Sequence, residues 1–70
     1  MVPFAVRLKE ARKRKRFTQK EVAEHLNIAA HTYQNYEIGE RRPNFEYLVA
    51  IADYLDVTTD YLLGRTDLPG

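Results

Sequence analysis

The 70-residue sequence contains no cysteine, which excludes disulfide bonds and thiolate metal sites. Long apolar runs are also missing. The first residues lack the hydrophobic stretch of a signal peptide, and no segment approaches the roughly 20 apolar residues that a membrane-spanning helix needs. We therefore expect a soluble cytoplasmic protein that contacts no membrane.

Patterns that would indicate an enzyme or a bound cofactor are absent as well. There is no glycine-rich phosphate loop, and no nucleophile is paired with a base. His25 and His31 have no cysteine or carboxylate at ligand spacing, and the three aspartates between residues 53 and 60 do not follow a calcium loop. We predict a single small domain over 1–70, with its core at about 4–64, no catalysis, no metal, no cofactor and no evident small-molecule ligand.

No stretch alternates apolar and polar residues for long enough to form a strand, so we predict an all-α fold. Helical spacing, N-cap residues and terminating glycines divide the chain into five helices and a frayed tail. The expected helices are 4–15, 19–26, 30–37, 45–55 after the cap Asn44, and 59–63 after the cap Thr58, with the tail at 65–70.

The segment 18–37 carries apolar residues at helical spacing on both sides of a short break at Asn27 and Ile28. Asparagine adopts the left-handed conformation more readily than other residues with a side chain, and Ile28 can fill the corner from inside. Thr18 and Glu21 form the pattern of a capping box where the first of these helices begins. This arrangement predicts a helix-turn-helix, in which the first helix presents the second to the major groove of DNA.

Further residues occur in a fixed order around this motif: Arg12, Gln19, Ala23, Glu37, Gly39, Pro43 and the ending LDVTTDYLLG at 55–64. Their joint order and spacing resemble the helix-turn-helix family of lambdoid phage repressors and Cro proteins, also called the xenobiotic-response-element family. Asn27 stands where that family usually has glycine. Tyr33 replaces a branched aliphatic residue, so the core must accommodate a ring and leave its hydroxyl in contact with water. The resemblance implies a lambda-repressor-like five-helix fold and a homodimer that binds a two-fold symmetric operator.

The outer face of the helix at 30–37 carries short or amide-bearing side chains, because Tyr33 and Tyr36 face inward. Asparagine and glutamine can each form two hydrogen bonds with the edge of adenine, whereas an ordinary solvated face more often carries Glu and Lys. The alternative is a merely polar surface. We predict four base-reading residues: Ala30, His31, Gln34 and Asn35.

Charge is distributed unevenly although the net charge is only +1. Residues 1–20 carry eight basic side chains and one acid, whereas 43–70 carry one basic side chain and five acids, so the chain offers one end to phosphates. Alternatively, the basic run at 13–16 is only a solvated helix end that offsets the helix dipole. The expected phosphate contacts are Gln19 at a helix N-terminus, Arg41 and Arg42 in a loop, and the hydroxyls of Thr32 and Tyr36.

The family resemblance also implies that Arg12 pairs with Glu37. A partly buried pair would hold the reading helix against the first helix, and removal of one partner would cost about 3 to 5 kcal/mol. An exposed pair, the alternative, would contribute only about 0 to 1 kcal/mol. We favour the buried brace.

Tyr61, Leu62 and Leu63 are consecutive large apolar residues on a very short helix. They cannot all face one core, because successive helical residues are about 100° apart. We assign Leu62 to the core, and Tyr61 with Leu63 or Leu68 to a dimer interface that a second copy covers. Alternatively, the tail 65–70 folds back over them.

We therefore predict a sequence-specific regulator of transcription, a repressor of the prokaryotic or phage kind, that binds double-stranded DNA as a homodimer and lies on the nucleoid when bound. A protein-interaction or antitoxin-like module of the same fold is the first alternative, against which Gln34 and Asn35 argue. Nonspecific binding of nucleic acid through the basic first helix is the second, and it would show steep salt dependence without sequence preference.

Overall fold

The computed structural model describes residues 3–70, and this part of the chain forms five helices and no strand. Residues 1 and 2, which belong to the single domain predicted over 1–70, lie outside the described residues. The predicted all-α, five-helix fold is confirmed; the first and last helices are each one residue shorter than expected, and the third is one residue longer. The helices are α1 (Phe4–Arg14), α2 (Gln19–Leu26), α3 (Ala30–Ile38), α4 (Phe45–Leu55) and α5 (Thr59–Leu62).

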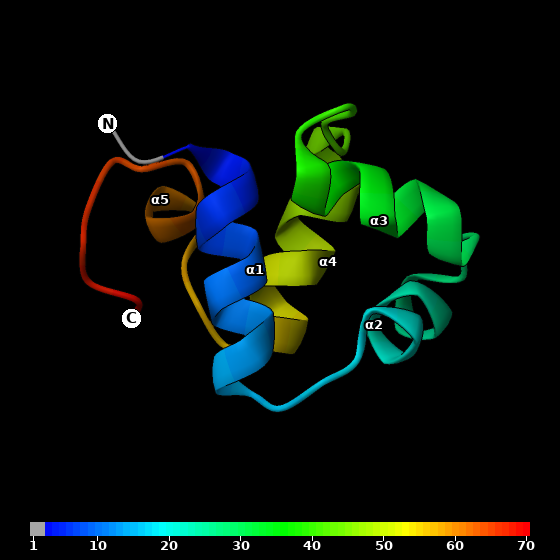
Figure 1. Cartoon of the computed structure of the whole chain (residues 1–70). Helices are drawn as coiled ribbons and strands as arrows, with labels where there is room; N and C mark the ends of the chain where they lie inside the picture. The colour runs from blue at the N-terminus through cyan, green and yellow to red at the C-terminus, as the bar shows by residue number, and fades with distance from the viewer. Residues whose placement is uncertain (1–2) are drawn as a thin grey trace.

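All five helices contribute to one core. α1 packs against α3 and α5, while α4 packs against α2 and α5, so α1 and α4 form the centre of the molecule. Figure 1 shows α2 and α3 together on one side of this centre, with α5 and the C-terminal segment on the other. Within residues 3–70, no helix is long and apolar enough to cross a membrane. The buried apolar residues are Leu8, Ala11, Val22, Ala23, Leu26, Tyr33, Tyr36, Ile51, Ala52, Leu55, Tyr61 and Leu62.

The helices begin where short-range signals in the sequence place their N-caps. The Thr18 hydroxyl accepts from the Glu21 N–H at 3.0 Å, and the Glu21 carboxylate accepts from the Thr18 N–H at 2.8 Å, which completes the predicted capping box. Asn44 caps α4 by accepting from the Tyr47 N–H at 2.8 Å. Gly39 ends α3 with a φ of 83°, a left-handed conformation that favours glycine.

Two corners of the chain share one backbone geometry. Asn27, between α2 and α3, has φ 57° and ψ 44°, and Asp56, between α4 and α5, has φ 57° and ψ 45°. In both corners the N–H of the next residue, Ile28 or Val57, donates to a carbonyl of the preceding helix at 3.0 Å. Asparagine and aspartate tolerate this left-handed position, which explains why the chain turns sharply without glycine at either place.

The C-terminal segment 65–70 folds back beside α1 and α5, so the predicted frayed tail is wrong (Figure 1). The alternative, a tail that covers Tyr61, Leu62 and Leu63, is met only in part, because Leu63 remains 42% exposed. The Arg7 side chain forms an ion pair with Asp67, and the Thr58 N–H donates to the Pro69 carbonyl at 2.8 Å. Arg7 is only 6% exposed, and a buried guanidinium is costly unless a carboxylate accompanies it. Asp67 supplies that carboxylate, which gives this segment a defined position.

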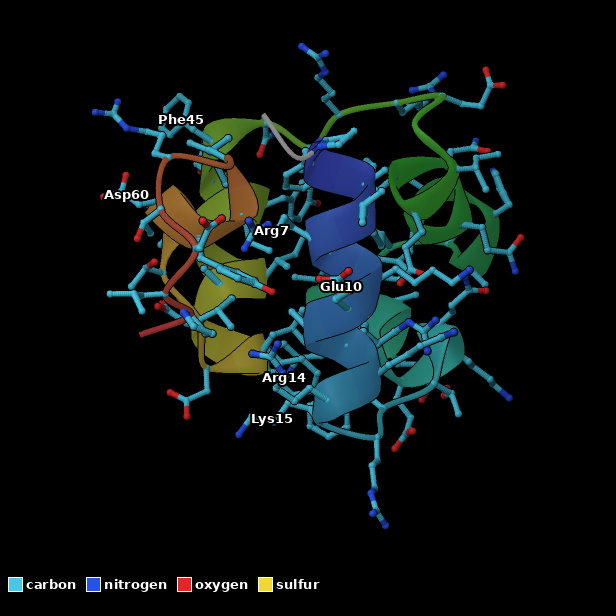
Figure 2. All side chains as sticks on the ribbon, turned by 60° about the vertical axis from the view of Figure 1, so that its left-hand side comes forward. Arg7, Glu10, Arg14, Lys15, Phe45 and Asp60 are labelled. Carbon is cyan, nitrogen blue, oxygen red and sulfur yellow. The ribbon has the colours of Figure 1, made fainter. Side chains whose placement is uncertain are left out.

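Tyr61 is buried in the core, 2% exposed, so its predicted exposure at a dimer interface is wrong. Its ring lies 4.4 Å from the Arg7 guanidinium carbon and 5.9 Å from that of Arg14, and its hydroxyl donates to Glu10 at 3.5 Å. Figure 2 shows Arg7 and Arg14 on the side of α1 that faces α5. Arg7 and Arg14 therefore cover the face of the Tyr61 ring that we predicted to be exposed. Leu62 is fully buried, as predicted.

Candidate nucleic-acid interface

The outer face of α3 exposes the side chains expected to read bases. Ala30, His31 and Gln34 are exposed, and Asn35 is half-buried beside them. None of these side chains is acidic, so the face carries hydrogen-bonding groups without a charge that would repel DNA. The geometry therefore places all four predicted base-reading residues on or at the edge of one accessible surface.

The first turn of α3 lacks a side-chain cap. Its N-cap residue, Ala29, has extended backbone angles but no side-chain hydrogen bond to the helix. The equivalent residue before α5, Thr58, accepts from the Tyr61 N–H at 3.0 Å. The amides at the start of α3 thus remain accessible to an acceptor from outside, and the helix dipole adds positive potential there.

The loop after α3 presents two arginines next to this surface. The Asn35 carbonyl accepts from the N–H groups of Gly39, Glu40 and Arg41, the last two at 3.0 and 3.2 Å, which folds the loop tightly against the end of the helix. Arg41 and Arg42 are both exposed. Their guanidinium groups are consequently free to meet phosphates on either side of a bound groove.

The other predicted phosphate contacts occupy different environments. Thr32 is half-buried in the first turn of α3, whereas Tyr36 is only 5% exposed and packs in the core. Burial raises the pKa of Tyr36, and the nearby phenol of Tyr47 raises it further. This burial argues against the phosphate contact expected for Tyr36.

A buried ion pair joins α1 to the end of α3. Arg12 Nε donates to Glu37 Oε2 at 2.6 Å, and Arg12 Nη2 donates to Glu37 Oε1 at 3.0 Å. The side chains are 12% and 2% exposed, respectively, so the predicted pair is present and buried. Arg12 also donates to the Phe17 carbonyl at 2.9 Å, which ties the α1–α2 connection to the same group. A two-bond pair of this kind fixes angles as well as distance.

Gln19 has a partner that the sequence did not reveal. Its Nε2 donates to Glu37 Oε1 at 3.1 Å, so the residue expected at a phosphate also belongs to the buried network. Burial alone would raise the pKa of the Glu37 carboxyl, but the hydrogen bonds from Arg12 and Gln19, together with the nearby Tyr33 phenol, outweigh it and hold the pKa below its ordinary value. Glu37 is therefore ionised at neutral pH despite its burial.

The Tyr33 side chain lies in the core, but its hydroxyl does not reach water as the sequence predicted. Its ring is fully buried and meets the Tyr36 ring edge-on at 6.2 Å, but its hydroxyl has no hydrogen-bond partner among the described residues and no contact with solvent. Burial, with the Glu37 carboxylate nearby, raises the pKa of this phenol strongly. The prediction that the hydroxyl would reach water is wrong, because the whole side chain is enclosed in the core.

Part of the positive charge in and directly after α1 is engaged in ion pairs within the protein. Arg7 and Arg12 are paired with Asp67 and Glu37, and Lys15 Nζ lies 3.6 Å from an Asp56 carboxylate oxygen. Arg7 and Arg12 are largely buried in these pairs, whereas Lys15 and Asp56 are exposed. The N-terminal excess of charge is thus partly structural, and both interpretations of the basic run at 13–16 stay predictions.

Comparison with known proteins identifies the family. The sequence profile of the helix-turn-helix family matches residues 8–62. The chain belongs to the helix-turn-helix family. This membership confirms the resemblance inferred from the motif at 18–37, and it covers every helix of the fold in whole or in part.

The helix-turn-helix relatives are regulators of transcription. AnsR, an HTH-type transcriptional regulator of Bacillus subtilis (strain 168), is 49% identical over 59 residues, 84% of this chain and 51% of AnsR. ImmR of the same organism is 45% identical over 62 residues, 89% of this chain and 49% of ImmR. RstR, a cryptic phage CTXphi transcriptional repressor of Vibrio cholerae, is 42% identical over 59 residues, 84% of this chain and 53% of RstR. The chain spans about half the length of these relatives.

A solved helix-turn-helix structure has the same fold. The P22 c2 repressor, crystallised in complex with a synthetic operator, superposes with a TM-score of 0.86 at 24% sequence identity, over 94% of this chain and 100% of the P22 chain. The five-helix arrangement is therefore the lambda-repressor-like one that the sequence predicted.

An apolar surface on α4 is absent from the residues predicted from the sequence. Phe45 and Val49 are 76% and 48% exposed, and Leu63 is 42% exposed after α5. The sequence contains a pattern that predicts this surface, because Phe45 and Val49 lie one helical turn apart and outside the core stripe of α4. Figure 2 shows Phe45 pointing outward at the edge of the molecule.

Proposed function

We propose that the chain is the DNA-binding domain of a transcriptional repressor and that it binds double-stranded DNA in a sequence-specific manner. The observation that carries this proposal is the accessible, acid-free outer face of α3, held by the buried Arg12–Glu37 pair in the fold of a protein crystallised with operator DNA. In this arrangement α3 enters the major groove, where side-chain amides distinguish base pairs. The bases are read by Ala30, His31, Gln34 and Asn35.

Groups suited to phosphates lie on both sides of α3 in this proposal. Gln19 stands in the first turn of α2, where helix amides already attract anions, and Arg41 and Arg42 stand in the loop after α3. Contacts of this kind set the register of the protein on DNA without reading sequence. We place such a protein in the cytoplasm, on the nucleoid.

Selection of a preferred site from random duplexes, followed by salt titrations, tests this assignment. The wild-type protein should prefer the selected site over a scrambled duplex. Arg41→Ala and Arg42→Ala should weaken binding similarly on both duplexes and reduce the salt slope by about 1 for each lost phosphate contact.

Arg65→Ala is a matched control, because Arg65 is exposed and pairs with Asp60 beside α5. It should leave the slope unchanged. Equal affinity of the wild-type protein for selected and scrambled duplexes would contradict the proposal, and an unchanged slope in both loop variants would remove the arginines from the interface.

We infer further that the protein acts as a homodimer on a palindromic operator, through Phe45, Val49 and Leu63. These three exposed apolar side chains lie on α4 and just after α5, and Leu63 also lines a hollow of about 600 Å³ together with Phe4 and Leu48. Arg41 and Arg42 also line the hollow, at its polar part. The projecting Phe45 ring and the apolar part of the hollow suit a two-fold contact, in which each copy offers both features. Leu63 stays in the interface that we inferred from the sequence, while Phe45 and Val49 replace the buried Tyr61.

Phe45→Asp should abolish cooperative two-to-one binding to a palindrome whose half-sites are about 34 Å apart, because a carboxylate would be buried in the contact. Sedimentation of the DNA complex measures the stoichiometry. Leu68→Asp is the comparison, since Leu68 is 69% exposed on the C-terminal segment. Cooperative binding that survives Phe45→Asp but is lost with Leu68→Asp would move the interface to that segment.

A further inference from the structure

The hydroxyl of Tyr33 is a buried donor without an acceptor. The residue is 0% exposed, and its edge-on contact with Tyr36 fixes the ring. Buried polar groups are nearly always hydrogen-bonded, so an unpaired one needs a reason. Tyr33 precedes Glu37 by one helical turn on α3, which brings the two side chains to the same side of the helix.

Glu37 receives its hydrogen bonds from two other helices. Arg12 of α1 donates to both carboxylate oxygens, and Gln19 of α2 donates to Oε1 at 3.1 Å. Tyr33 approaches the same carboxylate from its own helix, and its proximity helps to lower the pKa of Glu37. Three donor groups thus face Glu37, of which two are engaged and one is idle.

DNA binding creates a conflict at Gln19. This residue lies in the first turn of α2, where a backbone phosphate is expected, yet its amide nitrogen already donates to Glu37. If one amide nitrogen donated to the carboxylate and to a phosphate together, two anions would be held close to each other and would repel. Although Nε2 carries a second N–H, we expect Gln19 to leave Glu37 when it binds the phosphate, so that Oε1 loses a hydrogen bond.

We propose that Tyr33 is a positioning residue that replaces Gln19 at Glu37 when DNA binds. The inference rests on the proposed DNA-binding function. The hydroxyl rotates toward Oε1, so the carboxylate keeps its full set of donors and the Arg12–Glu37 pair keeps α3 in place. In the free protein the Tyr33 hydroxyl is buried without a hydrogen bond, and in the DNA complex it donates to Glu37.

Tyr33→Phe tests the exchange, because it deletes only the idle donor. The variant should melt at a higher temperature than the wild-type protein, since an unpaired buried hydroxyl is gone, yet it should bind the selected operator about 3- to 10-fold more weakly. A purely structural role would change stability and affinity in the same direction. Tyr36→Phe, the same change at the neighbouring buried tyrosine of α3, is the control and should not weaken binding in this way.

A double-mutant cycle links Tyr33 to Gln19. Gln19→Ala should weaken operator binding more in the wild-type background than in Tyr33→Phe, because Gln19 reaches the phosphate at full strength only when Tyr33 can replace it. Additive effects on binding, or an affinity unchanged by Tyr33→Phe, would overturn the exchange while leaving the DNA-binding function intact. A wild-type protein that preferred no duplex would overturn both.

Discussion

Replacement of Glu37 by alanine should lower the free energy of unfolding by about 3 to 5 kcal/mol, because it leaves the Arg12 guanidinium, 12% exposed, without its carboxylate. For a domain of this size such a loss is comparable with the whole stability. Urea unfolding followed by circular dichroism measures it. Glu40→Ala is the control, since Glu40 is exposed in the loop after α3. A loss below about 1 kcal/mol would mean that the pair behaves as an exposed one.

The same pair predicts the acid response of the protein. The pKa of Glu37 is lower in the folded chain than its ordinary value, so its contribution to stability is complete above the unfolded-state pKa and disappears as the pH falls through the folded-state value. Wild-type stability should therefore decline on the acid side. The decline should be shallower in Glu37→Gln, which has no carboxyl group to protonate at this position.

Asn35→Ala should cost about 1 to 3 kcal/mol of binding free energy on the preferred operator and should reduce the preference over scrambled DNA. The side chain lies at the edge of the outer face of α3, and only its backbone carbonyl holds the following loop, so the substitution leaves the fold in place. Fluorescence anisotropy on both duplexes gives the ratio, and a thermal melt checks folding.

Asp53→Ala is the control for this measurement, because Asp53 is exposed on α4, outside the proposed interface. It should leave the ratio of affinities unchanged. If Asn35→Ala bound both duplexes with the wild-type ratio, Asn35 would have no part in reading bases.

The elements of the fold could be predicted because their signals are local. Thr18 and Glu21 cap α2 within one turn, Asn44 caps α4, and Gly39 ends α3, each through contacts with residues close in sequence. The C-terminal segment could not be predicted in this way. The Arg7–Asp67 pair joins residues 60 positions apart, and its partner is defined only after α1 and α5 have packed.

In the candidate site, too, some features follow from a local sequence pattern and others depend on how the helices pack. The outer face of α3 follows from helical periodicity, so Gln34 and His31 were assigned to it directly from the sequence. The bond from Gln19 to Glu37 and the enclosed Tyr33 hydroxyl depend on how three helices meet. Spacing along one helix cannot specify those contacts.

The repeated corner has a consequence for where specificity is encoded. The chain turns through the same backbone angles at Asn27 and at Asp56, so the turn alone cannot make a helix a reader of DNA. The residue before the second helix differs between the two corners. Thr58 occupies the start of α5 with its own hydroxyl, whereas Ala29 leaves the start of α3 open. The same backbone turn therefore precedes one helix start that a side chain caps and another that no side chain caps, so the sequence sets the turn and the cap independently.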